Sequence, residues 1–104
     1  MSISERYRQL VDEIQILVRQ MGQEPLPEKA MGVVEKAVAT LREQMERVGE
    51  IPRIRIDDEL SPILLTAHNL FDRGRLMLEQ EACTTQAEQL WEVQKKLYRL
   101  LNDL

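Results

Sequence analysis

The chain has 104 residues, of which 43% are apolar, 31% charged and only 4% aromatic, and its net charge is −4. The length suits one domain with one hydrophobic core, and the apolar content is too high for a disordered chain. The acidic balance argues against nucleic acid as a partner, because the chain lacks a basic block that would neutralise phosphates. The aliphatic composition favours an all-α fold, since sheets use more aromatic and β-branched residues.

The first predicted helix covers residues 3–21. Ser2 and Glu5 have the spacing of a capping box, in which each side chain accepts a hydrogen bond from the other residue's backbone amide. Apolar residues then recur every three or four positions and form one face of the helix: Ile3, Tyr7, Leu10, Ile14, Leu17 and Met21. Gly22 and the two prolines that follow it end the helix.

The second predicted helix covers residues 27–48. Pro27 suits its first turn, because the amide that proline lacks would be unpaired there. Its apolar face consists of Met31, Val34, Val38, Leu41, Met45 and Val48. Gly49 supplies the stop. The short turn between the first two helices predicts an antiparallel pair.

Residues 50–61, with the sequence EIPRIRIDDELS, interrupt the helical pattern. Ile54 and Ile56 alternate with Arg53 and Arg55, which is the period of an extended chain. We therefore predict a long extended connection that covers a groove with isoleucine and delivers the third helix parallel to the second. A rival interpretation is that this segment pairs with another chain, as exposed extended segments readily do.

The third predicted helix covers residues 62–82, with Ser61 as its cap and Pro62 in its first position. An earlier start, at Asp57 or Asp58, stays open because proline is tolerated in the first turn. Gly74 lies on the apolar face and predicts a close approach of another helix backbone.

The fourth predicted helix covers residues 86–102, where Thr85 and Glu88 have capping-box spacing. No glycine or proline enforces a break before it, so three helices with one long bent C-terminal helix form the alternative. The favoured fold is a single all-α domain spanning residues 1–104, built as an antiparallel bundle of four helices with one long extended connection.

The sequence offers few residues for catalysis or metal binding. His68 is the only histidine; it could pair with Asp72 one turn later, but no nucleophile accompanies it. Glu43 and Glu46 have the spacing of a metal-binding acidic pair, but the facing Glu-x-x-His pattern is missing. Cys83 has no basic neighbour to activate its thiol. We predict no catalytic residue, no metal ligand and no cofactor, and expect that the protein is not an enzyme.

Cysteine content and hydropathy bear on the compartment. A single cysteine cannot form an internal disulfide, which fits a reducing environment. No apolar run approaches the roughly 20 residues that cross a bilayer, and the first residues lack the order of a signal peptide. We expect a cytoplasmic location and no membrane contact.

A protein–protein interaction module, such as a small adaptor, a chaperone-like protein or an assembly or regulatory factor, is the function that these observations favour. Trp91 and Tyr98 are seven residues apart and share one helical face, which suits an interface. Together with Ile54 and Ile56 they are the predicted contact residues. The heptad spacing also permits a homodimer, because a seam does not specify whether its partner belongs to the same chain.

Two alternative functions depend on residues that would have to converge in space. A small helical enzyme of unknown reaction would be built around His68, Glu43 and Glu46. A nucleic-acid-associated regulator would need four arginines on one surface: Arg53, Arg55, Arg73 and Arg75.

Overall fold

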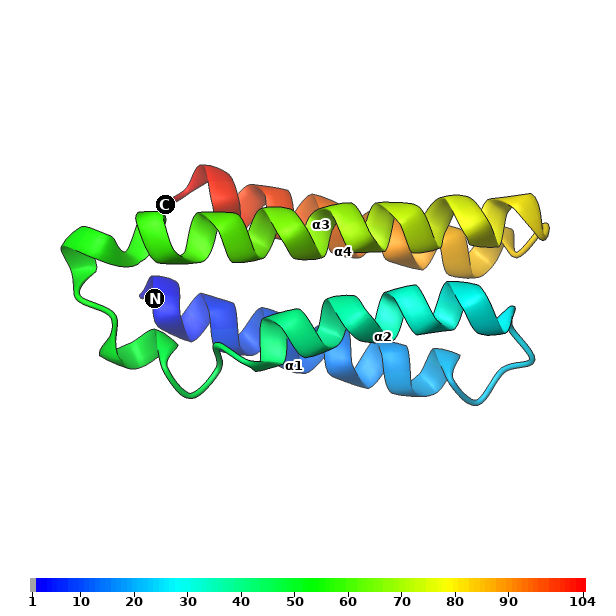
Figure 1. Cartoon of the computed structure of the whole chain (residues 1–104), viewed down its shortest axis with the longest axis horizontal. Helices are drawn as coiled ribbons and strands as arrows, with labels where there is room; N and C mark the ends of the chain where they lie inside the picture. The colour runs from blue at the N-terminus through cyan, green and yellow to red at the C-terminus, as the bar shows by residue number, and fades with distance from the viewer. Residues whose placement is uncertain (1) are drawn as a thin grey trace.

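A computed structural model describes residues 2–104 and confirms the antiparallel four-helix bundle. Each helix runs opposite to the one before it, and the bundle measures 43 × 21 × 20 Å (Figure 1). The helices are α1 (Ile3–Met21), α2 (Glu28–Arg42), α3 (Ile56–Gln80) and α4 (Thr84–Asn102). Two short 3-10 turns, η1 (Val48–Glu50) and η2 (Arg53–Arg55), lie in the connection between α2 and α3.

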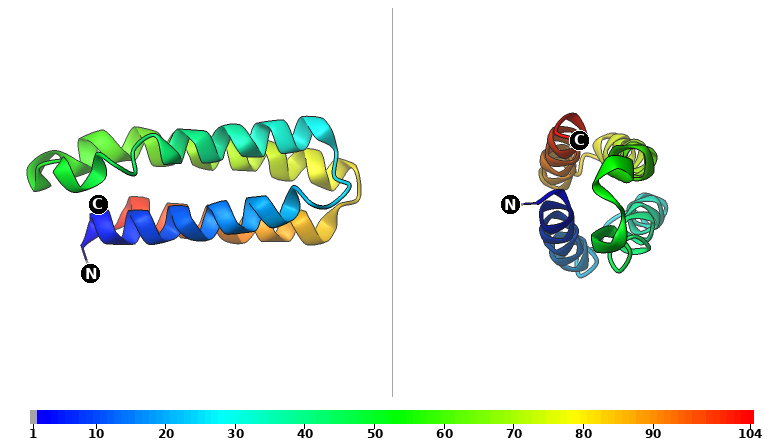
Figure 2. Two further views of the ribbon diagram at one scale, coloured as in Figure 1. Left: turned by 90° about the horizontal axis from the view of Figure 1, so that it is seen from below. Right: turned by 90° about the vertical axis from the view of Figure 1, so that its left-hand side faces the viewer.

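The four helices surround one apolar core. Viewed from the end, α1 lies diagonally opposite α3, and α3 packs against both α2 and α4 (Figure 2). The largest fully buried apolar side chains come from all four helices: Tyr7, Ile14, Met21, Leu41, Leu60, Leu64, Phe71, Leu78, Leu90, Leu97 and Leu100. The periodic stripes of the sequence therefore face one another.

Helix α1 has the predicted bounds and half of the predicted capping box. The Ser2 hydroxyl accepts a hydrogen bond from the backbone amide of Glu5 at 3.2 Å. The Glu5 carboxylate accepts a hydrogen bond from the Ser2 hydroxyl at 3.1 Å and not from the Ser2 backbone amide. One amide of the first turn is therefore satisfied by a side chain.

Helix α2 ends at Arg42, so the prediction that it reaches residue 48 was wrong. Two side chains of α1 donate hydrogen bonds to backbone carbonyl oxygens at this end of α2. The buried Tyr7 hydroxyl donates to the Leu41 carbonyl oxygen at 2.5 Å, and Arg8 Nε donates to the Met45 carbonyl oxygen at 3.2 Å. Burial raises the pKa of Tyr7, which keeps its hydroxyl protonated as the donor. Tertiary hydrogen bonds thus satisfy groups that further helical turns would have used.

The extended connection predicted for residues 50–61 is also wrong, because α3 begins at Ile56. Leu60 is fully buried and continues the helical stripe of α3, and the acidic residues 57–59 suit the positive end of a helix dipole. The segment therefore follows the helical period and not the short alternation around Ile54. The Ile54 side chain is 87% exposed, so it does not cover a groove as predicted. The connection returns at the end of the bundle where α2 stops, so α3 is antiparallel to α2 rather than parallel. Pro62 lies inside α3 on its exposed side.

A break separates α3 from α4, so the chain does not form one long C-terminal helix. Ala82 adopts a left-handed backbone conformation with φ 60°, and the Cys83 amide donates to the Leu78 carbonyl oxygen at 2.9 Å. This pattern closes the C-terminal end of α3. Helix α4 starts at Thr84, and no side chain caps it, so the predicted capping box at Thr85 and Glu88 does not form.

Gly74 is buried where α3 crosses α2, and the atom nearest to it there belongs to a side chain rather than to the predicted helix backbone. A Cβ atom at this position would lie 2.7 Å from Cγ2 of Val34 and 3.7 Å from the carbonyl oxygen of Ala30. A separation of 2.7 Å is shorter than van der Waals contact between carbon atoms. The absence of a side chain at Gly74 is therefore what lets the two helices approach.

Candidate functional site on the α3–α4 face

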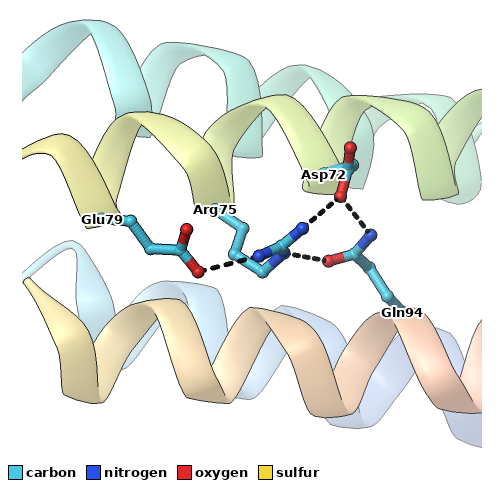
Figure 3. Close-up of polar contacts among 4 residues, drawn as sticks. All are labelled: Asp72, Arg75, Glu79 and Gln94. Atoms are coloured by element: carbon cyan, nitrogen blue, oxygen red, sulfur yellow. Dashed lines mark hydrogen bonds and ion pairs between the residues drawn. The ribbon is translucent and has the colours of Figure 1, made fainter.

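A closed set of hydrogen bonds joins α3 to α4 near the middle of the bundle (Figure 3). Gln94 Nε2 donates to Asp72 Oδ1 at 3.0 Å, and Arg75 Nε donates to Gln94 Oε1 at 3.0 Å. Arg75 Nη2 completes the triangle by donating to Asp72 Oδ1 at 2.7 Å, while Nη1 reaches Glu79 Oε1 at 2.8 Å. Gln94 is only 1% exposed, so its amide is positioned by bonds on both sides. We call Asp72, Arg75 and Gln94 the polar triangle.

The polar triangle keeps its ionised members charged. Hydrogen bonds from Arg75 and Gln94 lower the pKa of Asp72. The hydrogen bond to Asp72 raises the pKa of Arg75. The ion pair is charge-assisted and therefore stronger than a bond between neutral groups.

Two aromatic residues of α4 lie beside this network with much of their surface in solvent. The Arg75 guanidinium carbon is 5.2 Å from the ring centroid of Trp91, within the range of a cation–π contact. The ring of Tyr98 packs at a tilt against His68, with 6.4 Å between the centroids. Trp91 remains 47% exposed and Tyr98 56%. The structure thus brings these two predicted contact residues onto one surface.

A groove of about 680 Å³ runs between α3 and α4. Its lining includes Trp91, Tyr98 and His68, with Asp72 and Gln94 also contributing. His68 Nδ1 is buried and finds no hydrogen-bond partner among residues 2–104. The spacing that could pair His68 with Asp72 does not produce a hydrogen bond between them among residues 2–104, and the Oδ1 atom of Asp72 accepts from Arg75 and Gln94 instead. The groove therefore combines aromatic walls with a fixed polar centre.

Exposed apolar side chains gather on this side of the bundle. Leu65 and Leu76 of α3 are eleven positions apart, about three turns of 3.6 residues, so they share a face. Asp72, seven residues after Leu65, turns toward α4, which places both leucines on the flank next to α4. Residues 2–104 have six large exposed apolar side chains, and four of them form what we call the α3–α4 face: Leu65, Leu76, Trp91 and Tyr98.

The other predicted contact residues lie elsewhere. Ile54 in η2 and Ile56 at the start of α3 border a hollow of about 760 Å³ at the end of the bundle, together with residues near both chain ends. Ile54 is exposed, whereas Ile56 is partly buried. The four predicted contact residues therefore form two separate surfaces rather than one site.

Residues proposed for the alternative functions do not gather into one site. Glu43 and Glu46 lie exposed in the turn after α2 instead of along a helix. No group of three or more metal-binding side chains occurs in residues 2–104.

The four arginines are also dispersed. Arg53 and Arg55 precede α3, whereas Arg73 and Arg75 lie about 18 residues further on, roughly 27 Å along the helix. The charge of Arg75 is engaged within the polar triangle and by Glu79.

Sequence reasoning missed the polar triangle and the two leucines. Gln94 stands directly beside Val93 and between Leu90 and Leu97 in the apolar stripe of α4, which was a readable signal for a buried polar contact. Its partner could not be identified, because the pairing depends on how α3 and α4 are aligned. Leu65 and Leu76 lie outside the buried face of α3, and their spacing of eleven residues was the signal that could have identified them.

Comparison with protein-family models, with curated proteins and with solved structures finds no match. In the part of the chain that the structure describes, no helix is both long enough and apolar enough to cross a membrane.

Proposed function

We propose that this chain is a non-enzymatic protein–protein interaction module that binds its partner through the α3–α4 face. The observation that carries this proposal is the concentration of four of the six large exposed apolar side chains on one side of the bundle. Two of them, Trp91 and Tyr98, are of the residue types most enriched at the centres of interfaces. Scattered single apolar residues need no explanation, but a cluster of them indicates a binding surface.

The polar triangle supports this role by holding the surface rigid. Arg75 contacts the ring of Trp91 while its guanidinium group is bonded to Asp72 and Gln94. A side chain that is already fixed loses less conformational entropy on binding, so a rigid surface binds more tightly than a mobile one of the same area. A small adaptor, a chaperone-like protein or an assembly or regulatory factor in the cytoplasm fits this description.

The test compares two substitutions at equally exposed positions on different sides of the bundle. Tyr98→Asp introduces a charge on the α3–α4 face, and Ile16→Asp introduces one on α1; both side chains are 56% exposed. Affinity capture from the native cell extract is performed with the wild type and with both variants. Circular dichroism first establishes that each variant keeps its helical content.

We expect Tyr98→Asp to lose a protein that the wild type and Ile16→Asp both retain. Equal capture by all three proteins would contradict the assignment of the binding surface to the α3–α4 face. An added charge in the centre of an interface costs binding energy, because it must be desolvated without a partner.

A further inference from the structure

We propose that the partner of the α3–α4 face is a second copy of this chain, bound across a two-fold axis that runs along the length of the bundle. This inference rests on the proposed function and names the partner of the same surface. Such an axis places α4 of one copy over α3 of the other, with both at the same height along the bundle.

Contacts within one copy establish which residues share a height. Gln94 bonds Asp72, Trp91 contacts Arg75, and Tyr98 contacts His68. Across the two-fold axis, each α4 residue therefore faces the region of α3 that it neighbours within its own chain.

This alignment brings apolar groups together. Trp91 faces Leu76 of the second copy, because Leu76 follows the Arg75 that Trp91 neighbours. Tyr98 faces the turn of α3 between Leu65 and His68 of the second copy. Each contact occurs twice, so all four apolar side chains of the face are covered in both copies.

The same alignment pairs opposite charges. Lys95 follows Gln94 and therefore faces Asp72 of the second copy. Both hydrogen bonds that Asp72 accepts from Arg75 and Gln94 go to Oδ1, so Oδ2 is free of these bonds and available to an ammonium group. Among residues 2–104 Lys95 pairs with Glu92 alone, at 2.6 Å, and these side chains are 47% and 62% exposed. An exposed pair of this kind contributes little and exchanges easily.

Charge also selects between the two ways of forming a two-fold dimer. An axis perpendicular to the bundle would place α4 against α4, and Lys95 lies almost midway between Trp91 and Tyr98. Pairing those two aromatic residues would then bring the two copies of Lys95 together, and like charges repel. The axis along the bundle avoids this repulsion.

The size of the surface fits a stable dimer. The outline of one side of the bundle, about 43 × 20 Å or roughly 860 Å², is an upper limit to the area that can face a partner, and it accommodates the ~800 Å² that each partner buries in a standard interface. The four apolar side chains are spread along this side, from Leu65 near the middle of α3 to Leu76 about one turn before its end.

The experiment measures the mass of the full chain by sedimentation and light scattering over a range of concentrations. The wild type is expected at twice the monomer mass of 12.2 kDa. Leu76→Asp and Lys95→Glu should each raise the dimer dissociation constant by at least about tenfold. Two matched controls should remain dimeric. Ile16→Asp adds the same charge on α1, and Lys96→Glu reverses the neighbouring charge, which pairs with Glu13 of α1.

Each outcome decides a different point. A wild type that stays monomeric overturns the dimer, but the proposed function survives if Tyr98→Asp still loses a captured protein. If that capture is also unaffected, both proposals fail. A dimer that Leu76→Asp and Lys95→Glu leave intact uses another surface and overturns this inference. Circular dichroism of every variant separates loss of the dimer from loss of the fold.

Discussion

Both contacts of α3, with α2 and with α4, bury apolar side chains, but a different feature fixes each of them. Toward α2, Gly74 lies against Val34 at a distance that leaves no space for a Cβ atom. Toward α4, Asp72 and Arg75 bond the buried Gln94. Close packing is sensitive to added volume, whereas a buried polar contact is sensitive to the loss of one member. The contact with α2 is therefore destabilised by adding atoms, whereas the contact with α4 is destabilised by removing a hydrogen-bonding group.

The two contacts also set the alignment of the helices along their axes in different ways. Apolar side chains attract one another without directional preference, so the contact between α2 and α3 is positioned by steric fit, as at Gly74 against Val34, rather than by bond angles. Hydrogen bonds require particular distances and angles. The polar triangle therefore fixes the height of α4 relative to α3, and with it the surface that Trp91 and Tyr98 form.

Removing the amide of Gln94 is expected to have the largest effect. Gln94→Leu keeps the side chain close in size but removes both hydrogen bonds, which leaves Arg75 Nε without its partner at the buried amide. We expect the free energy of unfolding to fall by about 2 kcal/mol. Chemical denaturation followed by circular dichroism measures this change.

The same substitution elsewhere on α4 provides the control. Gln89 has a buried Oε1 atom with no hydrogen-bond partner among residues 2–104. Gln89→Leu removes a polar atom that has no partner, so it should leave stability unchanged or raise it by about 1 kcal/mol. Equal destabilisation by both variants would show that the polar triangle contributes nothing specific.

Adding one methyl group tests the packed side of α3. Gly74→Ala gains about 1 kcal/mol of helix propensity but forces the new Cβ against Val34, and such overpacking typically costs 1–3 kcal/mol. We expect a net loss of stability of about 1 kcal/mol, measured as a lower midpoint of denaturation.

Gly32 offers a matched comparison within α2. A Cβ atom there would meet nothing within 4 Å, so Gly32→Ala should raise stability by about 0.5–1 kcal/mol. If Gly74→Ala is as stabilising as Gly32→Ala, the close approach of α2 and α3 is not a constraint.

Lowering the pH should weaken the contact between α3 and α4 that Asp72 makes, and the direction of its pKa shift defines the pH range in which this occurs. The pKa of Asp72 is lower in the folded protein than its ordinary value of 3.8, so its ionised form stabilises the fold fully above that value. The contribution is lost as the pH falls below 3.8 and through the folded pKa. Asp72→Asn should therefore lower stability at neutral pH by about 1 kcal/mol or less, since the group is partly exposed.

The stabilities of wild type and Asp72→Asn should converge in acid. Thermal denaturation at pH 7 and at successively lower pH values measures the difference between the two proteins. A difference that stays constant across this range would show that ionisation of Asp72 does not contribute.

Local patterns predicted the helices better than the segments between them. The stripes of α1 and α4 are regular, and the structure retains them. The end of α2 could not be inferred from its own sequence, because Tyr7 and Arg8 supply the hydrogen bonds from another helix. At Ile56 two periods competed, and only the burial of Leu60 in the assembled core decided in favour of helix.

The candidate site depended even more on tertiary structure. Trp91 and Tyr98 could be placed on one face by their spacing alone, since both belong to α4. The contacts that α3 contributes could not, because a shift of one turn would have paired Gln94 with other residues. Ile54 and Ile56 were predicted as contact residues from the alternation of an extended segment, and the fold separates them from the two aromatic residues.

The ion pair between Arg6 and Asp103, at 2.8 Å, links the start of α1 to the residue after α4 at the end of the bundle where the α2–α3 connection also lies (Figure 1). The helices form a closed ring in space, in which α4 neighbours α1, with a sparser contact than the one between α2 and α3. A short linker between residues 104 and 2, with a cut in residues 43–55, would give a circular permutant with the helix order α3, α4, α1, α2. Every pair of packed helices would be preserved, because moving the chain ends changes only the order in which the helices are connected and not the contacts between them.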